Sequence, residues 1–441
     1  MKLVDALNLE NPIQIAFAGA GGKTTALFRL ARQLPGPVFV TTTTHLGQDQ
    51  VGLADRAVIL DNSTGLERYF ELPTPKITLF TGPATSDGRM SGLDNASLDR
   101  LHAFCLKNGI PLLVEADGSR GLPLKAPAAH EPPIPGWVNV VVYVAGMAGL
   151  NQPLNPDFVH RVEQFSKIAG LEGGETISTG ALAAVLSDPL GGLKNIPDMA
   201  RRIALLNQAD SIEIQSQAGQ IAEKINHFYD ATLVGALHDS ENEIKACYKP
   251  IAGIILAAGG STRFGQSKPL LAWHGKPFIR QVAETALQAG LDSLMVVIGF
   301  NGEQVEAALN GLPVRIIHNT EWQSGQSTSV KAGIDALPPR TGAAIFLLAD
   351  QPQILPTIIS ALIEHHRQNL SPIVAPLVEG KRANPVLFDR AAFPALTAIT
   401  GDSGGRQVFS KFHVSWLEWN DPNLLLDVDT PEDYQRLLEI Q

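Results

Sequence analysis

In two glycine-rich stretches of this sequence, a lysine lies close to glycine residues, which have no side chain to cover the backbone. The first, AGAGGKTT, covers residues 18–25, and the second, LAAGGSTRFGQSKPLL, covers residues 256–271. Glycine lets backbone N–H groups approach an anion closely, and a nearby lysine or arginine neutralises phosphoryl oxygens. Both stretches therefore predict phosphate chemistry. The alternative for each is a tight glycine turn with solvated cations.

The second stretch has partners for phosphoryl chemistry further along the chain. Arg263 and Lys268 place two cations about a loop's width apart, Asp350 ends the apolar run AAIFLLADQP, and Asp429 lies in LLLDVDTPED. Mg²⁺ prefers one or two carboxylates together with phosphate oxygens and water. We therefore expect Mg²⁺ at Asp350 and Asp429. The alternative for Asp429 is a helix cap, since Thr430 and a proline follow it.

The first stretch is an irregular phosphate loop. The usual G-x-x-x-x-G-K-[ST] spacing would place a glycine at position 17, where the chain has phenylalanine. The residues that we expect to contact a nucleotide are Gly19, Gly21, Gly22, Lys23, Thr24 and Thr25. The apolar run that precedes VEADGSR ends at Glu115 and Asp117, where a carboxylate can position Mg²⁺ or water. Thr24 and Asp117 are the candidate metal ligands of this stretch.

Other polar residues are less specific. Arg120, Lys125 and His130 are either ligands or ordinary surface, and Gln208 stands in NQAD where a guanine-reading NKxD motif has lysine. ATP and GTP therefore both stay open for the first loop. The 11 histidines show no HExxH spacing, and we expect His365 and His366 on the surface of a helix. No G-x-S-x-G motif is present.

The elements around the two stretches repeat one order. Strand-like residues 12–20 run into glycines and a helix at 24–33, and strand-like residues 251–258 run into glycines and a helix at 278–289. This order is typical of open α/β sheets, whose ligands bind at the carboxyl ends of the strands. We expect two α/β domains, at 1–245 and 250–441, joined by polar residues 238–249.

Further strands are expected in each half. In the first half they are residues 38–42, 57–60, 77–80, 112–115 and 138–145, and in the second half residues 294–298, 314–318, 343–348, 373–376 and 385–388. Residues 157–206 have apolar spacing near 3.6 and are predicted to be mostly helical, within a helix-rich part at about 151–235.

Composition excludes several classes of protein. The 441 residues are 44% hydrophobic, with 34 basic and 44 acidic side chains and a net charge of −10. No lysine or arginine run offers a surface for nucleic acid or an anionic membrane. Apolar runs are too short to span a membrane, and the N-terminal residues lack a secretory signal. Cys105 and Cys247 fit a reducing compartment, so we expect a cytoplasmic protein.

The second half resembles the nucleotidyltransferases of molybdenum-cofactor maturation, particularly the molybdenum cofactor cytidylyltransferases, which are MobA-like NTP transferases. The resemblance rests on LAAGGSTRFGQSK (256–268), NTEWQSGQSTSVKAG (319–333), LLADQP (347–352), GKRANPVLF (380–388), GDSGGRQVF (401–409) and DVDTPED (427–433). It implies a GT-A or Rossmann-like α/β domain.

The resemblance also implies roles for individual residues. The triphosphate loop is Leu256, Ala257, Ala258, Gly259 and Gly260, with Arg263 and Lys268 on the phosphates. Gly325, Ser327 and Ser329 lie near the base and ribose, Asp350 and Asp429 hold Mg²⁺, and Asn384 and Pro385 face the pterin.

The implied reaction joins CTP to Mo-molybdopterin and releases pyrophosphate. Ala258 follows the cytidylyl pattern LAAG, whereas guanylyl relatives resemble LAGG. Ala383 and Gly405 depart slightly from the family pattern, where glycine and alanine are common. The alternatives are a GTP-using or sugar-phosphate nucleotidyltransferase, or a cofactor carrier without turnover.

The first half resembles the YqeC-like accessory family of selenium-dependent molybdenum hydroxylases. The matching stretches are FAGAGGKTT (17–25), VTTTTHLG (40–47), EADGSRGLPLKAPAAHEP (115–132), VHR (159–161) and LLNQAD (205–210). The resemblance implies a P-loop-like nucleotide-binding domain and a hydroxylase apoenzyme as partner. Fusion raises the effective concentration of one domain near the other. We hypothesise that the first half uses nucleotide to deliver or modify the cofactor made by the second.

Overall fold

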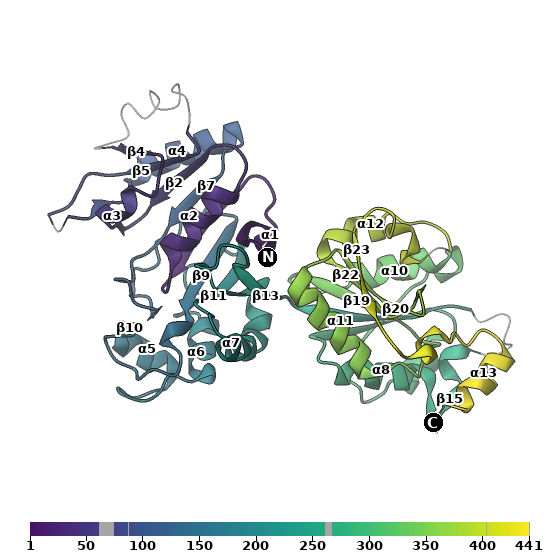
Figure 1. The fold of residues 1–441 in the computed structure, drawn as a ribbon. Helices are drawn as coiled ribbons and strands as arrows, with labels where there is room; N and C mark the ends of the chain where they lie inside the picture. Colours follow the sequence, from purple (N-terminus) through teal and green to yellow (C-terminus); the bar gives the residue numbers. More distant parts are fainter. Residues whose placement is uncertain (61–74, 87, 261–266, 403, 441) are drawn as a thin grey trace. The chain divides into compact units, whose positions relative to one another are not determined.

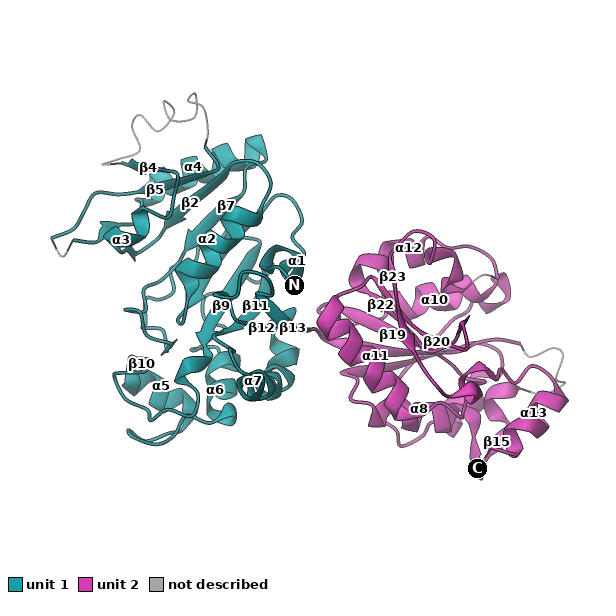
Figure 2. Ribbon diagram, viewed as in Figure 1, with its two compact units in different colours: residues 1–248 teal, residues 249–441 magenta. Residues whose placement is uncertain are grey.

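The computed structural model divides the chain into two compact units (Figure 1). It describes residues 1–60, 75–86, 88–260, 267–402 and 404–440, so Arg263 lies outside the described residues. Unit 1 comprises Met1–Tyr248 and unit 2 comprises Lys249–Gln441 (Figure 2). Each unit is an α/β fold built on its own sheet.

Unit 1 is built on a sheet in which every described strand pair except the last is parallel. In spatial order its strands are β4 (Arg56–Ile59), β5 (Ile77–Thr81), β2 (Val38–Thr42), β7 (Leu112–Glu115), β1 (Gln14–Gly19), β9 (Val140–Gly146), β11 (Arg201–Asn207), β12 (Ala231–Gly235) and the antiparallel β13 (Ile244–Tyr248). All six residues of β1 are buried, as expected for a central parallel strand with both faces covered.

Helices cover this sheet and pack against it in separate hydrophobic clusters. The α-helices are α1 (Leu3–Leu7), α2 (Lys23–Gln33), α3 (Gln48–Val51), α4 (Asn95–Asn108), α5 (Val162–Ala169), α6 (Thr179–Ser187) and α7 (Ile212–Ile225). Phe165, Leu182 and Ile221 of α5, α6 and α7 pack with β9 and β11, whereas Leu101 of α4 packs with β2, β5 and β7. Asp94 caps α4 by accepting a hydrogen bond from the Ser97 N–H.

Short elements complete unit 1. Two small ribbons pair β8 (Leu124–Lys125) with β10 (Val159–His160) and β3 (His45–Leu46) with β6 (Met90–Ser91). The 3₁₀ turns are η2 (Met147–Gly149) and η3 (Asn226–Phe228).

One sequence prediction for unit 1 is wrong. Residues 157–206 are not mostly helical, because α5 and α6 are followed by β11, a strand between β9 and β12. Its apolar run is typical of a buried parallel strand, which periodicity alone does not separate from a helix. The boundary between the units, after Tyr248, lies within the predicted join at 238–249, which also contains the edge strand β13 with Ile244 and Cys247 buried. Lys245, Ala246 and Tyr248 are only partly buried, as expected for a strand at the edge of a sheet.

Unit 2 has a mixed sheet with β14 near its middle. In spatial order the strands are β18 (Arg315–His318), β17 (Ser293–Ile298), β14 (Ile251–Ala257), β19 (Ala343–Leu348), β22 (Val386–Asp389), β20 (Ile373–Val378) and β21 (Lys381–Arg382), and β23 (Val414–Glu418) pairs with β20. The first four are mutually parallel, whereas β22 runs antiparallel to both neighbours. A separate ribbon joins β15 (Ala272–Trp273) to β16 (Lys276–Pro277).

Helices lie on both faces of the unit 2 sheet. The α-helices are α8 (Phe278–Gln288), α9 (Gly302–Ala308), α10 (Gln326–Asp335), α11 (Pro356–Asn369), α12 (Phe393–Thr397) and α13 (Pro431–Leu438), with 3₁₀ turns η4 (Lys268–Leu270), η5 (Trp322–Ser324), η6 (Arg390–Ala392), η7 (Gly405–Val408) and η8 (Pro422–Leu425). Ile255 of β14 packs with α8 and α11, whereas its neighbour Ile254 packs with α10 and α12. This alternation is the two-residue period of a strand buried on both faces.

The surface position predicted for His366 is also wrong, because this residue is fully buried in α11. Its Nε2 lies 2.9 Å from Asp389 Oδ2, and Lys249 Nζ donates to the same oxygen at 2.6 Å. Burial lowers the pKa of His366, although Asp389 opposes this shift. Burial also acts to raise the pKa of Asp389, but Lys249 and His366 outweigh it and hold that pKa well below its usual range.

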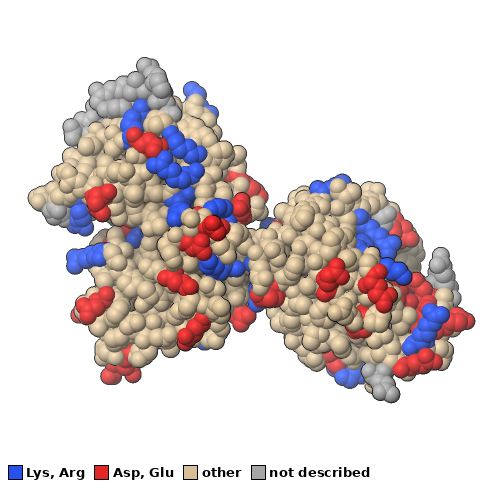
Figure 3. All heavy atoms as spheres, viewed as in Figure 1, with Lys and Arg blue, Asp and Glu red and all other residues tan. Residues whose placement is uncertain are grey.

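The surface carries mixed charge. Figure 3 shows acidic and basic side chains interspersed over the visible face of each unit. Within the described ranges, no helix combines the length and the apolar character that crossing a membrane requires.

Candidate nucleotide sites in the two units

The unit 2 site lies at the carboxyl ends of β14 and β19. These parallel strands pair Leu256 with Leu348, so the residues that follow them emerge at the same edge of the sheet. The glycine stretch begins directly after Ala257, and Asp350 lies two residues beyond β19. Strand register therefore places the glycine stretch and Asp350 at one edge, as the sequence pattern predicts.

Lys268 joins two carboxylates at this edge. Its Nζ lies 2.6 Å from Asp429 Oδ1 and 3.7 Å from Asp350 Oδ2. The Lys268 side chain is 14% exposed and that of Asp350 is 27% exposed, so both face a restricted volume. Two carboxylates that converge on one cation match the donor set that Mg²⁺ uses with phosphate oxygens.

Asp429 is not the cap of the following helix. Thr430 is the N-cap of α13, its side chain accepts from the Asp433 N–H, and the Asp433 carboxylate accepts from the Thr430 N–H. This capping box leaves the Asp429 carboxylate to Lys268. In the described residues no group of three or more His, Cys, Asp or Glu can hold a metal ion. A metal at Asp350 and Asp429 would therefore depend on substrate oxygens.

The carboxylates of the described part of this site act on one another. Burial raises the pKa of Asp350 to about 6, where Lys268 opposes the shift and the charges of Asp427 and Asp429 add to it. Burial also raises the pKa of Asp427, with a further contribution from Asp429, although Gln351 donates a hydrogen bond to it at 2.5 Å. A divalent cation would relieve this repulsion.

The residues expected near base and ribose lie at the start of α10. Gly325 has φ 111° and precedes the helix, where an added Cβ would lie 2.5 Å from the carbonyl carbon of Gly401. Ser327 and Ser329 are buried, and the Ser329 hydroxyl accepts from Asn319 Nδ2 at 2.9 Å. The close approach to Gly401 therefore requires glycine at 325, and Ser329 has a partner inside the unit.

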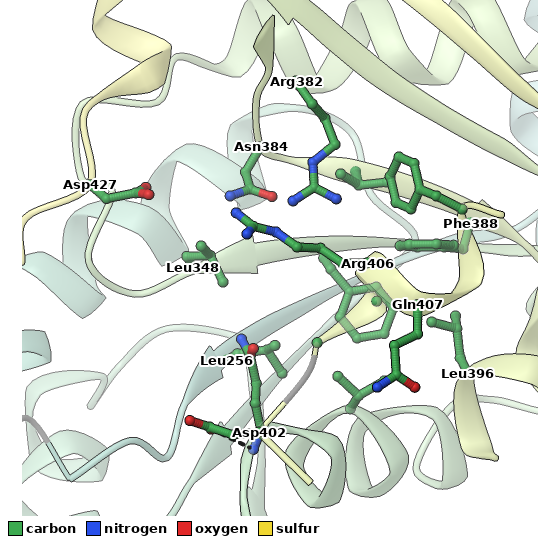
Figure 4. Close-up of a pocket in the computed structure, with 17 residues that line it drawn as sticks. Leu256, Leu348, Arg382, Asn384, Phe388, Leu396, Asp402, Arg406, Gln407 and Asp427 are labelled. Atoms are coloured by element: carbon green, nitrogen blue, oxygen red, sulfur yellow. Dashed lines mark hydrogen bonds between the residues drawn. The ribbon is translucent and has the colours of Figure 1, made fainter. Parts of the chain in front are cut away.

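A pocket of about 360 Å³ opens beside these elements (Figure 4). Leu256 and Leu348, at the ends of β14 and β19, lie on one side, and Figure 4 shows Arg382, Asn384 and Arg406 pointing toward one another. Asn384 therefore lines a pocket, as its predicted substrate role requires. Pro385 follows it and is buried.

Sequence reasoning did not single out Arg382 and Arg406. The Arg382 guanidinium lies 4.7 Å from the centre of the Phe409 ring, and burial, with Arg406 next, lowers its pKa. Both arginines stand inside stretches that carried the family resemblance, GKRANPVLF and GDSGGRQVF. Their positive charge inside these stretches is the sequence signal from which a binding role could have been predicted.

The unit 1 loop follows β1 and is held tightly against β9. Gly19, Gly21 and Gly22 have φ of 95°, 79° and 117°, values that favour glycine. An added Cβ would lie 2.2 Å from Val144 O at Gly19 and 2.3 Å from Gly146 Cα at Gly21. No larger side chain fits either position unless the backbone moves, so the conformation of the loop depends on glycine at both positions.

Lys23 and Thr24 begin α2 and contact different carboxylates. Lys23 Nζ donates to Gly19 O at 2.8 Å and lies 3.4 Å from Asp117 Oδ1. Thr24 Oγ1 donates to Glu115 Oε2 at 2.8 Å, since β1 and β7 pair Phe17 with Glu115. Burial raises the pKa of Glu115, and Lys23 opposes that shift. Glu115, and not Asp117, is therefore the carboxylate beside the loop hydroxyl.

A cavity of about 1120 Å³ adjoins this loop. Its lining includes the loop residues Gly21, Gly22, Lys23, Thr24 and Thr25, together with Arg120, His130, Glu131, His160, Arg161 and Gln208. Asn207, the first residue of NQAD, donates from Nδ2 to Gly21 O at 2.8 Å and so braces the loop. Lys125 is buried, whereas Arg120 and His130 are exposed at the cavity.

Comparisons with known proteins match the two units separately. Residues 15–163 match the model of the YqeC protein family, and residues 253–419 match the MobA-like NTP transferase domain. The uncharacterized protein YqeC of Escherichia coli (strain K12) is 30% identical over 243 residues, which cover 54% of this chain and 92% of that protein. The chain belongs to the YqeC family in unit 1 and to the MobA-like NTP transferases in unit 2.

Unit 2 is accordingly a nucleotidyltransferase. The nicotine blue oxidoreductase of Paenarthrobacter nicotinovorans is 32% identical to this chain over 198 residues, covering 43% of this chain and 96% of that protein. Among solved structures, the crystal structure of Rv0371c from Mycobacterium tuberculosis H37Rv is 30% identical, with a TM-score of 0.39 and coverage of 43% of this chain and 99% of that chain.

Proposed function

We propose that unit 2 transfers CMP from CTP to Mo-molybdopterin and releases pyrophosphate. The observation that carries this proposal is Lys268 between Asp350 and Asp429, at the strand edge where the glycine stretch begins. The acceptor follows from the resemblance to the molybdenum-cofactor nucleotidyltransferases, and CTP follows from Ala258 in LAAG. The family match supports nucleotidyl transfer itself.

In this reaction a terminal phosphate oxygen of the acceptor attacks the α-phosphorus of CTP in line. The bond from the α-phosphorus to the α–β bridging oxygen breaks, and pyrophosphate leaves without a covalent enzyme intermediate. Lys268 neutralises charge that develops on the phosphoryl oxygens, and Arg263 is proposed to do the same. Asp350 and Asp429 would hold Mg²⁺, which would supply further charge neutralisation.

The pocket in Figure 4 is proposed to hold the acceptor. Asn384 presents an amide to it, while Arg382 and Arg406 present two guanidinium groups suited to an anionic group. Phe409 lies under Arg382 and gives the pocket an aromatic wall. Asp427 also lines the pocket, so the pocket reaches the acidic cluster where transfer would take place.

The test is to incubate the full chain with Mg²⁺, molybdopterin cofactor and CTP, GTP or ATP in turn, and to measure pyrophosphate. We expect release with CTP and cofactor together. If pyrophosphate is released with GTP and not with CTP or ATP, the assignment changes from cytidylyl transfer to guanylyl transfer. Release with CTP and a sugar phosphate in the absence of pterin would indicate a sugar-nucleotide enzyme. Tight cofactor binding without pyrophosphate would indicate a carrier.

For unit 1 we propose nucleotide binding at the loop of Gly19 to Thr25, in support of hydroxylase maturation. The specific observation is Thr24 bonded to Glu115 beside a buried lysine at a helix N-terminus, with a large cavity in front. A hydroxyl and a carboxylate are suitable ligands for Mg²⁺ on a nucleotide. Lys23→Ala is expected to weaken nucleotide binding and maturation of the hydroxylase apoenzyme. Unchanged values for both would refute the proposal.

A further inference from the structure

A chain of alternating charges runs through unit 1 from the phosphate loop to Arg161. Lys23 lies 3.4 Å from Asp117, Asp117 lies 2.7 Å from Lys125, and Lys125 lies 3.0 Å from Glu131. Glu131 accepts two hydrogen bonds from the Arg161 guanidinium, at 2.5 and 2.7 Å. Lys23 and Arg161, the two ends of this chain, both line the cavity.

Burying the charged side chains in the middle of this row costs free energy. The side chains of Lys23, Asp117 and Lys125 are 3%, 1% and 0% exposed. Buried ion pairs recover their desolvation cost only partly, and apolar residues of similar volume often serve stability equally well. Buried charges beside a cavity are instead typical of functional sites. This row of charged side chains therefore indicates that both of its end residues, Lys23 and Arg161, have a function in the cavity.

The two ends differ in charge balance. At the loop, Lys23 faces the carboxylates of Asp117 and Glu115, which suits a magnesium-bound phosphate. At the other end, a single carboxylate, Glu131, is bound by both Lys125 and Arg161.

Arg120 also lines the cavity, and we call Arg120 and Arg161 together the cationic wall. Its positive field is felt by His160, whose pKa falls to about 4 through burial and then through Arg161, Lys125 and Arg120. The cavity of about 1120 Å³ also exceeds the roughly 300–1000 Å³ usual for one small ligand.

We propose that unit 1 is a phosphotransferase that binds two substrates in this cavity, a nucleoside triphosphate at the loop and a small anionic acceptor at the cationic wall. The acceptor is a molecule with a free hydroxyl and with a phosphate or carboxylate group that Arg161 binds. This inference rests on the nucleotide site proposed above for the loop.

In the proposed step the acceptor hydroxyl oxygen attacks the γ-phosphorus. The bond from that phosphorus to the β–γ bridging oxygen breaks, and the nucleoside diphosphate leaves with its electron pair. The hydroxyl proton passes to solvent. The products are the phosphorylated acceptor, the nucleoside diphosphate and one proton.

The experiment uses the full chain with Mg²⁺, a non-hydrolysable ATP or GTP analogue at saturation, and inorganic phosphate as the probe of the cationic wall. Backbone hydrogen exchange localises both ligands within unit 1, so binding at unit 2 does not interfere. We expect the analogue to protect residues 19–25 and phosphate to protect residues 159–169 while the analogue stays bound.

Variants separate the two sites. Arg161→Gln is expected to raise the phosphate concentration needed for protection at 159–169 by about tenfold or more, with analogue binding within about twofold. Arg161→Lys, which keeps the charge, should recover part of the effect. Arg32→Gln is the matched control, because Arg32 is also paired with a carboxylate, Asp55 at 2.6 Å, but belongs to the exposed end of α2.

Each outcome decides between the proposals. Phosphate that displaces the analogue, or that fails to protect 159–169 in the wild-type chain, overturns the second-substrate site and leaves the nucleotide site standing. Equal weakening of both ligands by Arg161→Gln does the same. If the analogue fails to protect residues 19–25, the proposed nucleotide site is refuted. The phosphotransferase proposal is then refuted as well, because it requires a bound phosphoryl donor.

Discussion

Both units place a lysine beside two carboxylates at the end of a central strand, but the charged residues next to that group differ. In unit 2, Lys268 faces Asp350 and Asp429, and the charge of Asp429 also acts on Asp427. In unit 1, Lys23 begins a chain in which cations outnumber carboxylates toward Arg161. Similar glycine–lysine stretches therefore lead to different electrostatic environments.

The difference shows that the lysine does not by itself define the site. In unit 2, the carboxylates of Asp350, Asp427 and Asp429 act on one another, and this favours a divalent cation that bridges to phosphate. The cationic wall of unit 1 favours a second anion facing the loop. Loop construction differs as well, since Gly21 is packed against Gly146 whereas no described atom lies within 4 Å of a Cβ added at Gly259.

The largest expected effect is on unit 2 turnover. Asp350→Asn removes a carboxylate from the acidic cluster, and we expect nucleotidyl transfer at saturating Mg²⁺ to fall by about a thousandfold. Pyrophosphate release measures it, with circular dichroism to check folding. Asp335→Asn is the control, because Asp335 is exposed at the end of α10. Substantial retained turnover in Asp350→Asn would remove the metal role from this residue.

The two carboxylates of unit 1 should separate binding from stability. Asp117→Asn leaves Lys23 and Lys125 without their shared partner, and we expect it to lower the free energy of unfolding of unit 1 by about 3–5 kcal/mol. Glu115→Gln is expected to preserve stability and to weaken Mg²⁺-dependent nucleotide binding by about tenfold or more. Urea unfolding and nucleotide titration measure the pair. Equal behaviour of the two variants would contradict the division of roles.

Glycine replacement tests the difference in loop construction. Gly21→Ala combines a left-handed φ with a backbone clash, and we expect a loss of about 2–4 kcal/mol in unit 1. Gly259→Ala should change the stability of unit 2 by less than about 0.5 kcal/mol. It should nevertheless raise the KM for CTP, because the methyl group holds the phosphates away. Gly36→Ala, with a positive φ but no close neighbour, isolates the cost of φ. A Gly21→Ala loss no larger than that of Gly36→Ala would exclude the clash.

The smallest effect concerns acid stability of unit 2. The folded-state pKa of His366 lies below its ordinary 6.5, so the unfolded chain takes up this proton first as the pH falls. Wild-type stability is therefore lost below about pH 6.5, by at most about 1.4 kcal/mol per pH unit from this group. Asp389, whose pKa is lowered, loses its contribution only below 3.8.

His366→Gln keeps a donor for Asp389 but does not titrate. We expect its stability to decline less than that of the wild type between pH 7 and pH 5, as measured by hydrogen exchange in α11. Parallel declines in the two proteins would show that His366 does not contribute to the pH dependence.

Much of the arrangement could be predicted because it is local or follows from parallel pairing. The strands at β2, β7 and β19 lie where continuous apolar residues predict them. Lys268 meets Asp350 because both follow neighbouring parallel strands. β11 and β13 were missed because a buried strand resembles a helix in its apolar content and an edge strand resembles a polar linker.

Side-chain partners across the fold were less accessible to prediction. Glu115 and Asp117 are two residues apart, and the sequence favoured Asp117 as the metal ligand, yet only Glu115 lies on β7 in register with the loop strand. Arg161 reaches the cavity through pairing of β10 with β8, two very short strands without a strong pattern. Arg382 and Arg406 come from separate elements, β21 and η7, that both line the pocket.

The sequence by itself determined the glycine–lysine stretches, the strands before them and the α/β class, because these depend on backbone freedom and on residues close together in the chain. The tertiary structure decided which carboxylate each lysine contacts and which charges remain unbalanced. Those properties depend on distances of a few ångströms between residues on different strands. Register and packing set such distances, and Coulomb energies at short range are steep enough for small shifts to reverse the balance.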